Sequence, residues 1–414
     1  MKSKNIFYGW YIVAATWFIY LALTSVTTYG GSVVTTHLVL DRGWSESIVG
    51  YQNAFLYAAI AVVSIPTGVL ARKKGVKFLY IISALLGGGT CILFYLTNVP
   101  YLLYIGAYFF FGSSIAMGGH VTAPVMMDSW FDRRKSLAMA IVMTGGGIGG
   151  FFIPQVVEKL YSAFDARTCW LFMGIVELAA LVPIILVERN SPQEVGEVRD
   201  GIEWNKNHSR PADAKKPAAK SHMTLSEACR TGTFVKIAVS NTAFRIAQNV
   251  FMAYAMLHMI HKGLPSAAAV TVISCSNILN MTGRLSVPFI EKLGIKKNAI
   301  AAGSFSLMLI GLLLFAFSEK IMILLPAGGM AGFATGIMMT LAPLLLSEYG
   351  EEAYFSEQYG MLNTISFACM IVTPLLVSGS ASLFGDYKPT FLVLAAACGV
   401  SALLSGTLKR KAVQ

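Results

Sequence analysis

Long apolar runs separated by short polar stretches recur along almost the whole chain. Each run is close to the roughly 20 apolar residues that a helix needs to cross the hydrocarbon core of a bilayer. The pattern therefore predicts an all-α membrane protein of about twelve transmembrane helices. The expected spans are residues 9–36, 46–70, 78–97, 101–128, 136–160, 168–187, 233–260, 266–289, 298–317, 321–346, 356–381 and 388–407.

Basic residues gather at the ends of alternate apolar runs, as in residues 72–77, 133–135 and 292–297. Loops rich in Lys and Arg are typical of the cytoplasmic side of a membrane protein. We therefore expect a multi-pass protein of the cell (inner) membrane, with its N- and C-termini in the cytoplasm.

One segment, residues 188–232, breaks the apolar pattern with prolines and charges of both signs. This composition is typical of a linker, and we expect its charges to be solvated. The linker would join an N-terminal six-helix bundle of residues 1–187 to a C-terminal six-helix bundle of residues 233–414.

Composition agrees with a lipid-covered surface, because the 414 residues are 55% hydrophobic and only 13% charged. A soluble domain is usually nearer about a quarter charged. The net charge of +11 lies at helix ends, so nucleic-acid binding is not expected. Six scattered cysteines form no CxxC pair, which gives neither a disulfide framework nor a metal site. No ATP-binding motif is present, and no cofactor is expected.

The two halves share a loop pattern of charge–Lys–x–Gly–x–Lys, at residues 72–77 and again at 291–296. A duplicated six-helix unit places a binding cavity between its copies, near the bilayer midplane. The loop resembles the signature between helices 2 and 3 of the major facilitator superfamily. That resemblance implies twelve transmembrane helices in two pseudo-symmetric bundles. Where the family usually has an aspartate this chain has Arg72, while the second copy keeps an acid, Glu291.

A narrower resemblance lies in Phe7–Trp10 and in Trp130–Ala138. Both stretches are similar to the monocarboxylate transporter family and its bacterial relatives, which include oxalate/formate antiporters. The resemblance implies a secondary active transporter and no enzymatic activity. It would move a small organic anion, first of all a monocarboxylate, by alternating access. Transport would be coupled to protons or to exchange of a second anion.

Arg284 is the first candidate for substrate binding, because a charge within a membrane span is costly unless it is paired or hydrated. The resemblance implies that it holds a carboxylate, and a guanidinium can do so through two parallel hydrogen bonds. Asn280 and Asn277 lie one and two turns away on the same face. The alternative is an arginine that extends to the nearer membrane surface.

A polar stripe in the seventh span is the second candidate, with Asn241, Arg245, Gln248 and Asn249 at i, i+4, i+7 and i+8. These positions share one helix face, and a polar face within a span is turned to protein or water. The alternative is pairing between helices.

Three groups are candidates for proton coupling. His120 and Asp128 lie on one face of the fourth span, and a histidine exchanges protons near neutrality. Glu177 lies midway along the sixth span, where an acid could carry a proton. The alternatives are a hydrogen-bonded packing histidine and a peripheral sixth helix.

The chain departs from the resembling carriers at three places. They have an aspartate where Asn280 stands and a lysine where Thr28 stands, and the oxalate exchanger has a lysine where Ser366 stands. These changes argue against simple copying of their proton coupling and against an oxalate dianion, unless Arg245 supplies the second charge. Thr28 and Asn363 are candidates for polar cavity lining.

Opposite charges occupy repeat-related loops: basic residues 133–135 follow the fourth span, and four glutamates lie within 348–357 after the tenth. They could clasp the halves in one transport state, although exposed pairs contribute only about 0–1 kcal/mol each. The alternative is two unrelated solvated loops. The gating candidates are Arg72, Lys73, Arg133, Arg134, Glu348 and Glu351.

Two other functions stay open: a multidrug or amphiphile exporter on the same fold, and a non-transporting sensor. The expected partners are a small organic anion, protons or a counter-anion, and the lipid bilayer, with the protein a monomer and no nucleic acid bound.

Overall fold

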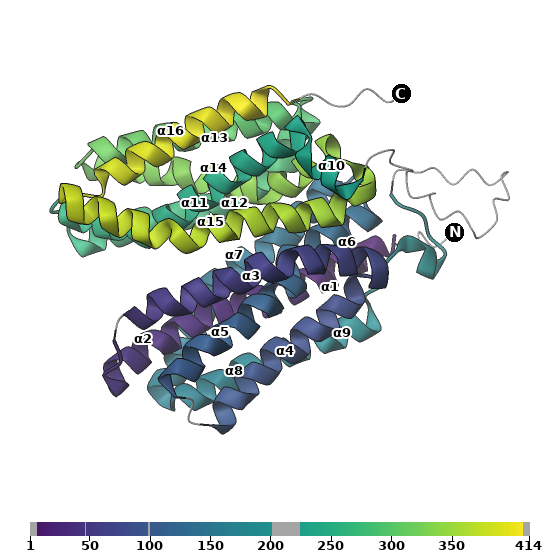
Figure 1. Cartoon of the computed structure of the whole chain (residues 1–414), viewed down its shortest axis with the longest axis horizontal. Coiled ribbons are helices and arrows are strands. Elements are labelled where there is room, and N and C mark those ends of the chain that lie inside the picture. The colour runs from purple at the N-terminus through teal and green to yellow at the C-terminus, as the bar shows by residue number, and fades with distance from the viewer. Residues whose placement is uncertain (1–5, 46, 98–99, 201–223, 409–414) are drawn as a thin grey trace. The chain divides into compact units, whose positions relative to one another are not determined.

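The computed structural model describes residues 6–45, 47–97, 100–200 and 224–408, and throughout these ranges the regular elements are helices (Figure 1). The expectation of an all-α protein is therefore confirmed. Residues 201–223, which form the middle of the expected linker, lie outside the described ranges.

Several helices of the first half are continuous across a change in winding. The first runs through α1 (Gly9–Tyr20), the π-helical segment η1 (Leu21–Gly30) and α2 (Gly31–Arg42). The fourth runs through α5 (Tyr101–Ile115), the π-helical segment η2 (Ala116–His120) and α6 (Thr122–Trp130). A π-helical turn holds one more residue than an α-helical turn and is frequent at functional sites. The other helices are α3 (Ser47–Lys74), α4 (Val76–Leu96), α7 (Lys135–Ala163), α8 (Ala166–Ala179) and α9 (Leu181–Leu186).

The second half begins with α10 (Leu225–Arg230) and contains six long helices, one for each expected span. They are α11 (Gly232–His261), α12 (Ser266–Lys292), α13 (Lys297–Phe317), α14 (Ile321–Tyr349), α15 (Phe355–Phe384) and α16 (Lys388–Gly406). Two short 3-10 turns, η3 (Pro192–Val195) and η4 (Glu352–Tyr354), complete the described elements.

Nine helices in the described ranges are long and apolar enough to cross a membrane. The expected spans in α11, α12 and α15 are long helices that fall outside this group. Their polar side chains lower the mean hydropathy, and they include the candidate residues of the seventh and eighth spans. Helices of this kind are stable in a membrane where the polar face is turned away from lipid.

The chain divides into two compact units. The first contains Met1–Cys229 and Gly350–Asn363, and the second contains Arg230–Tyr349 and Thr364–Gln414. The division into six-helix bundles at residues 1–187 and 233–414 stays a prediction.

The close contact between α12 and α14 in the second unit depends on a glycine, and this contact positions the backbone of Arg284. Gly336 of α14 lies directly against the carbonyl of Asn280 and the amide of Arg284 in α12. A Cβ atom at Gly336 would overlap the Asn280 carbonyl oxygen, so only glycine allows the two backbones to lie this close. The backbone that carries Arg284 is thereby fixed on α14.

We predict that Gly336→Ala lowers the melting temperature of the purified protein, because the new methyl group must push α12 away from α14. Overpacking of this kind costs about 1–3 kcal/mol. Gly303→Ala in α13 is the matched control, since a Cβ atom there meets nothing within 4 Å. Thermal unfolding in detergent measures both variants, and equal melting temperatures would contradict the prediction.

Candidate functional site

Arg284 is buried in the second unit, with 6% of its surface exposed. Its Nε donates a hydrogen bond of 2.9 Å to Oδ1 of Asn280, one turn earlier in α12. Its carbonyl oxygen accepts a hydrogen bond of 3.4 Å from Thr340 of α14. The side chain is thus turned toward the middle of α12 and away from the nearer end of the helix at Lys292. This geometry differs from that of an arginine that extends to the membrane surface at that end of the helix.

Arg245 of α11 lies in apolar surroundings. Its guanidinium carbon is 5.6 Å from the centre of the Phe367 ring, and one terminal nitrogen is 3.7 Å from the sulfur of Met339. Its Nε is buried without a hydrogen-bond partner among the described residues. No carboxylate in the described part of the chain forms an ion pair with Arg245. A partly buried cation of this kind is stabilised when an anion binds beside it.

The two arginines lie at the same level of α14, because Met339 contacts Arg245 and the next residue, Thr340, bonds to Arg284. Asn241, one turn before Arg245, is buried and donates a hydrogen bond of 2.8 Å to Ser366 of α15. The structure therefore brings part of both predicted stripes to one level of the second unit. Asn277 is exposed, and Gln248 is half-buried.

Other predicted binding residues are engaged within their own helices. Thr28 donates its hydroxyl to the carbonyl oxygen of Thr24 at 2.5 Å. Asn363 is buried and donates to the carbonyl oxygen of Tyr359 at 2.9 Å, while its Oδ1 has no hydrogen-bond partner within the described ranges. His120 is half-buried at the last position of η2.

Two predicted proton-coupling acids have different surroundings in the first unit. Asp128 pairs with Lys135 at 2.6 Å and with Arg199 at 3.4 Å, which favours a structural role. Glu177 is buried, with 1% of its surface exposed, and accepts a hydrogen bond from Thr27 on Oε1. Its Oε2 has no hydrogen-bond partner in the part of the chain that the structure describes. Glu177 is therefore the group whose surroundings suit a bound proton.

Comparison with known proteins places this fold in a family. A family model described as Major Facilitator Superfamily matches residues 12–374. The chain belongs to the Major Facilitator Superfamily. Members of this family are membrane transporters and not enzymes, so this major facilitator protein is a multi-pass membrane protein, as expected.

Curated relatives of this major facilitator protein include several monocarboxylate transporters. Monocarboxylate transporter 12 of Rattus norvegicus is 24% identical over 305 residues, covering 69% of this chain and 62% of that protein. The chain thus spans less than two thirds of that relative. Monocarboxylate transporter 12-B of Danio rerio is 22% identical, covering 96% and 86%. The riboflavin transporter MCH5 of Saccharomyces cerevisiae is 24% identical, covering 71% and 56%.

Solved structures show the same fold over nearly the whole chain. The E. coli fucose:proton symporter FucP has a TM-score of 0.74 at 12% identity, covering 98% of this chain and 100% of that chain. The proton:xylose symporter XylE has a TM-score of 0.72 at 15% identity, covering 96% and 94%. At such identities the likeness establishes the fold alone.

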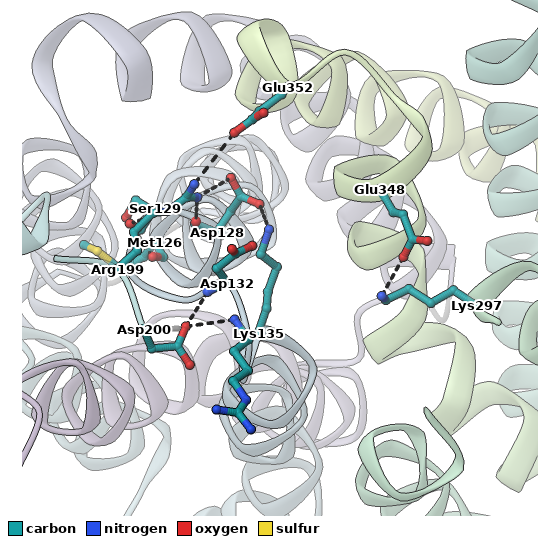
Figure 2. Close-up of polar contacts among 11 residues, drawn as sticks. Met126, Asp128, Ser129, Asp132, Lys135, Arg199, Asp200, Lys297, Glu348 and Glu352 are labelled. Carbon is teal, nitrogen blue, oxygen red and sulfur yellow. Dashed lines mark hydrogen bonds and ion pairs between the residues drawn. The ribbon is translucent and has the colours of Figure 1, made fainter. Parts of the chain in front are cut away.

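One expectation about the linker of this major facilitator protein is wrong. Residues 187–200, which we call the clasp segment, pack on the first unit, so their charges are not simply solvated. Asp200 accepts a hydrogen bond from the backbone amide of Asp132 (Figure 2). It also accepts from the amides of Arg133 and Arg134, at 3.1 and 2.8 Å. Arg199 donates to the carbonyl oxygens of Asp128 and Ser129, the latter at 3.1 Å.

Two of the gating candidates, Arg72 and Glu348, form ion pairs with residues outside that set. Figure 2 shows Arg199, from the clasp segment, between Asp128 and Glu352, and its distance to the Glu352 carboxylate is 3.7 Å. Glu348 pairs with Lys297 at 2.6 Å in the second unit. Arg72 pairs with Glu357, which belongs to the first unit, and Lys73 is exposed. The backbone amide of Glu351 donates to Gln358 at 3.0 Å.

Glu188, the second residue of the clasp segment, is a buried acid outside the candidates expected from the sequence, and it is 0% exposed. It accepts a hydrogen bond of 2.8 Å from Thr16 of α1. A signal was present in the spacing: Thr16 and Thr27 are eleven residues apart, as are Glu177 and Glu188. Eleven residues make about three turns of an unbroken α-helix, so the spacing alone predicts that each pair shares one face. Two antiparallel helices with these pairs can therefore form two Thr–Glu contacts.

We predict that Arg245→Met stabilises the protein without ligand, because an uncompensated cation in apolar surroundings is replaced by an apolar side chain of similar length. The variant removes the desolvation cost of a charge that no carboxylate compensates. Arg284→Met is the comparison, and we expect it to destabilise, because it leaves the buried Asn280 carbonyl without its donor. Melting temperatures in detergent test the pair, and a lower value for Arg245→Met would contradict the prediction.

Proposed function

We propose that this chain is a secondary transporter that moves a small organic anion, first of all a monocarboxylate, by alternating access. The observation that carries the proposal is the pair of arginines at one level of the second unit, of which Arg245 has no carboxylate partner among the described residues. A guanidinium binds a carboxylate through two parallel hydrogen bonds. The monocarboxylate transporters among its relatives support the same class of substrate.

In this proposal Arg284 binds the carboxylate, and Asn280 holds the guanidinium in position through the bond to its Nε. Arg245 adds positive potential at the same level, and Phe367 provides an apolar surface for the remainder of the substrate. Asn241 fixes the face of α11 on α15 through Ser366.

Coupling to protons is proposed for Glu177. Burial disfavours the charged form of a carboxyl group, and Thr27 provides one hydrogen bond in place of water. The acid would bind a proton in one transport state and release it in another. Exchange of a second anion at the arginines is the alternative mode of coupling.

Arg284→Gln tests the substrate claim in proteoliposomes loaded with labelled solutes. We expect saturable uptake of one carboxylate class by the unaltered protein and a decrease of about 30-fold or more in the variant, because a buried charged contact is lost. The panel contains formate, acetate, lactate, pyruvate, oxalate, succinate and riboflavin. Riboflavin is included because one relative is named a riboflavin transporter.

Lys292→Gln is the matched control, since it removes an exposed cation from the end of the same helix. This control should transport normally. Absence of carboxylate uptake by correctly inserted unaltered protein would refute the anion proposal and favour the exporter.

A proton gradient separates the two coupling modes. We expect that Glu177→Gln abolishes gradient-driven accumulation while exchange of internal for external substrate continues, because only the former requires a group that gains and loses a proton. Asp165→Asn is a control for a surface acid, since Asp165 is exposed before α8. Unchanged gradient-driven accumulation in Glu177→Gln would remove this acid from the coupling mechanism.

A further inference from the structure

Glu188 lies in a fully buried polar cluster that the proposed transport site does not use. Its neighbours are Thr16 of α1 and Tyr80 of α4, and Thr122 of α6 lies beside Tyr80; all three are 0% exposed. Thr16 donates to Oε1 of Glu188, but Oε2 has no hydrogen-bond partner within the described ranges. A buried carboxylate needs several donors to remain charged, and this one has a single donor there.

The charges that face Glu188 do not compensate for its burial. Lys77 of α4 and Arg189 of the clasp segment are its cationic neighbours. The Lys77 ammonium is exposed and donates to the carbonyl oxygen of Ile185 at 3.0 Å, and Arg189 donates to the carbonyl oxygen of Glu188 at 2.8 Å. Neither forms an ion pair with the Glu188 carboxylate in the described part of the chain. Burial raises the pKa of Glu188 to about 8, against the weaker opposing effects of Thr16, Lys77 and Arg189.

The clasp segment that carries Glu188 holds several parts of the first unit together. The Val187 and Arg189 carbonyl oxygens accept hydrogen bonds from the Tyr8 hydroxyl at 2.9 Å and from the Trp130 indole at 3.0 Å. Asn190 accepts from the Lys77 amide at the start of α4, at 2.9 Å. The segment then ends on the loop before α7 through Arg199 and Asp200. Release of the segment would carry Glu188 into water.

We propose that Glu188 is a proton-binding site, and that the bound proton stabilises the packing of the clasp segment on the first unit. The proposal does not depend on the transported substrate. Protonation removes the charge that would otherwise be buried beside a single hydrogen-bond donor, the Thr16 hydroxyl. Loss of the proton leaves a buried charge, which favours release of the segment into water.

The direction of the pH effect follows from the two states. The packed segment holds the proton up to pH about 8, whereas the free carboxyl group holds it only to its ordinary value of 4.5. Packing is therefore most stable below pH 4.5, weakens as the pH rises from 4.5 to about 8, and is least stable above that. Within this window the equilibrium for packing changes by up to about tenfold for each pH unit.

Infrared titration of the full chain in nanodiscs tests whether Glu188 binds the proton. We expect a protonated-carboxyl stretching band that disappears near pH 8 and that is missing in Glu188→Gln. Glu194→Gln is the matched control, since Glu194 is an exposed acid of the same segment. Glu177→Gln identifies any band of the other buried acid. The same titration in the unaltered protein and Glu188→Gln would overturn the proposal.

Hydrogen exchange of the amides of residues 132–134, corrected for the intrinsic effect of pH, tests the effect on packing, because these amides bond to Asp200. Their protection should fall by up to about tenfold for each pH unit between 4.5 and 8 in the unaltered protein and in Glu194→Gln. Glu188→Gln, which is always neutral, should keep its protection at high pH. If its protection falls as in the unaltered protein, the proposal is wrong. If the infrared and exchange results are as expected but the protein transports no carboxylate, the proposed function is wrong and the proposal for Glu188 still holds.

Discussion

The cost of placing charge in an apolar interior governs the arrangement of this protein. Each buried ionisable group makes a different set of contacts that reduces this cost. Arg284 lies against Asn280 and Arg245 against an aromatic ring and a sulfur atom, while Glu177 and Glu188 each accept one hydrogen bond from a threonine of the first helix. Among the described residues, Nε of Arg245 and Oε2 of Glu177 and Glu188 have no hydrogen-bond partner, and the proposals above assign an anion to the first and a proton to each of the other two. A protein that moves ions through a membrane needs groups of this kind, held in place but not neutralised.

Helix packing supplies the fixed positions that such groups require. The contact of Gly336 with the backbone of α12 sets the height of Arg284, and the same helix, α14, places Met339 beside Arg245. In the first unit the π-helical segments η1 and η2 contain Thr27 and His120. An extra residue in a turn changes which face the following residues occupy, so the polar positions of these helices follow no single α-helical period. Close packing and altered winding together decide which polar residues meet.

Much of the fold follows from the sequence, because spans of about 20 apolar residues and basic loops depend on local composition. The polar stripe of α11 and the position of Arg284 could also be predicted from the sequence, since both follow from spacing along one helix. The hydrogen-bond and ion-pair partners of these residues could not be predicted from the sequence. Asp128, for example, resembles a proton carrier because it shares a helix face with His120. Its pairing with Lys135 depends on the turn before α7, and its pairing with Arg199 depends on the clasp segment. Glu188 was overlooked because it directly follows an apolar run and begins a polar segment, and hydropathy treats such a residue as solvated.

The contact between Asp200 and residues 132–134 is made to the main chain of that loop, not to its side chains. Every amino acid except proline offers the same amide. The conformation of the loop therefore does not depend on the side chains at these positions. The charged groups of Arg133 and Arg134 take no part in the contact with Asp200. Sequence drift at these two positions can change the electrostatic character of this surface while the architecture beneath it is inherited unchanged.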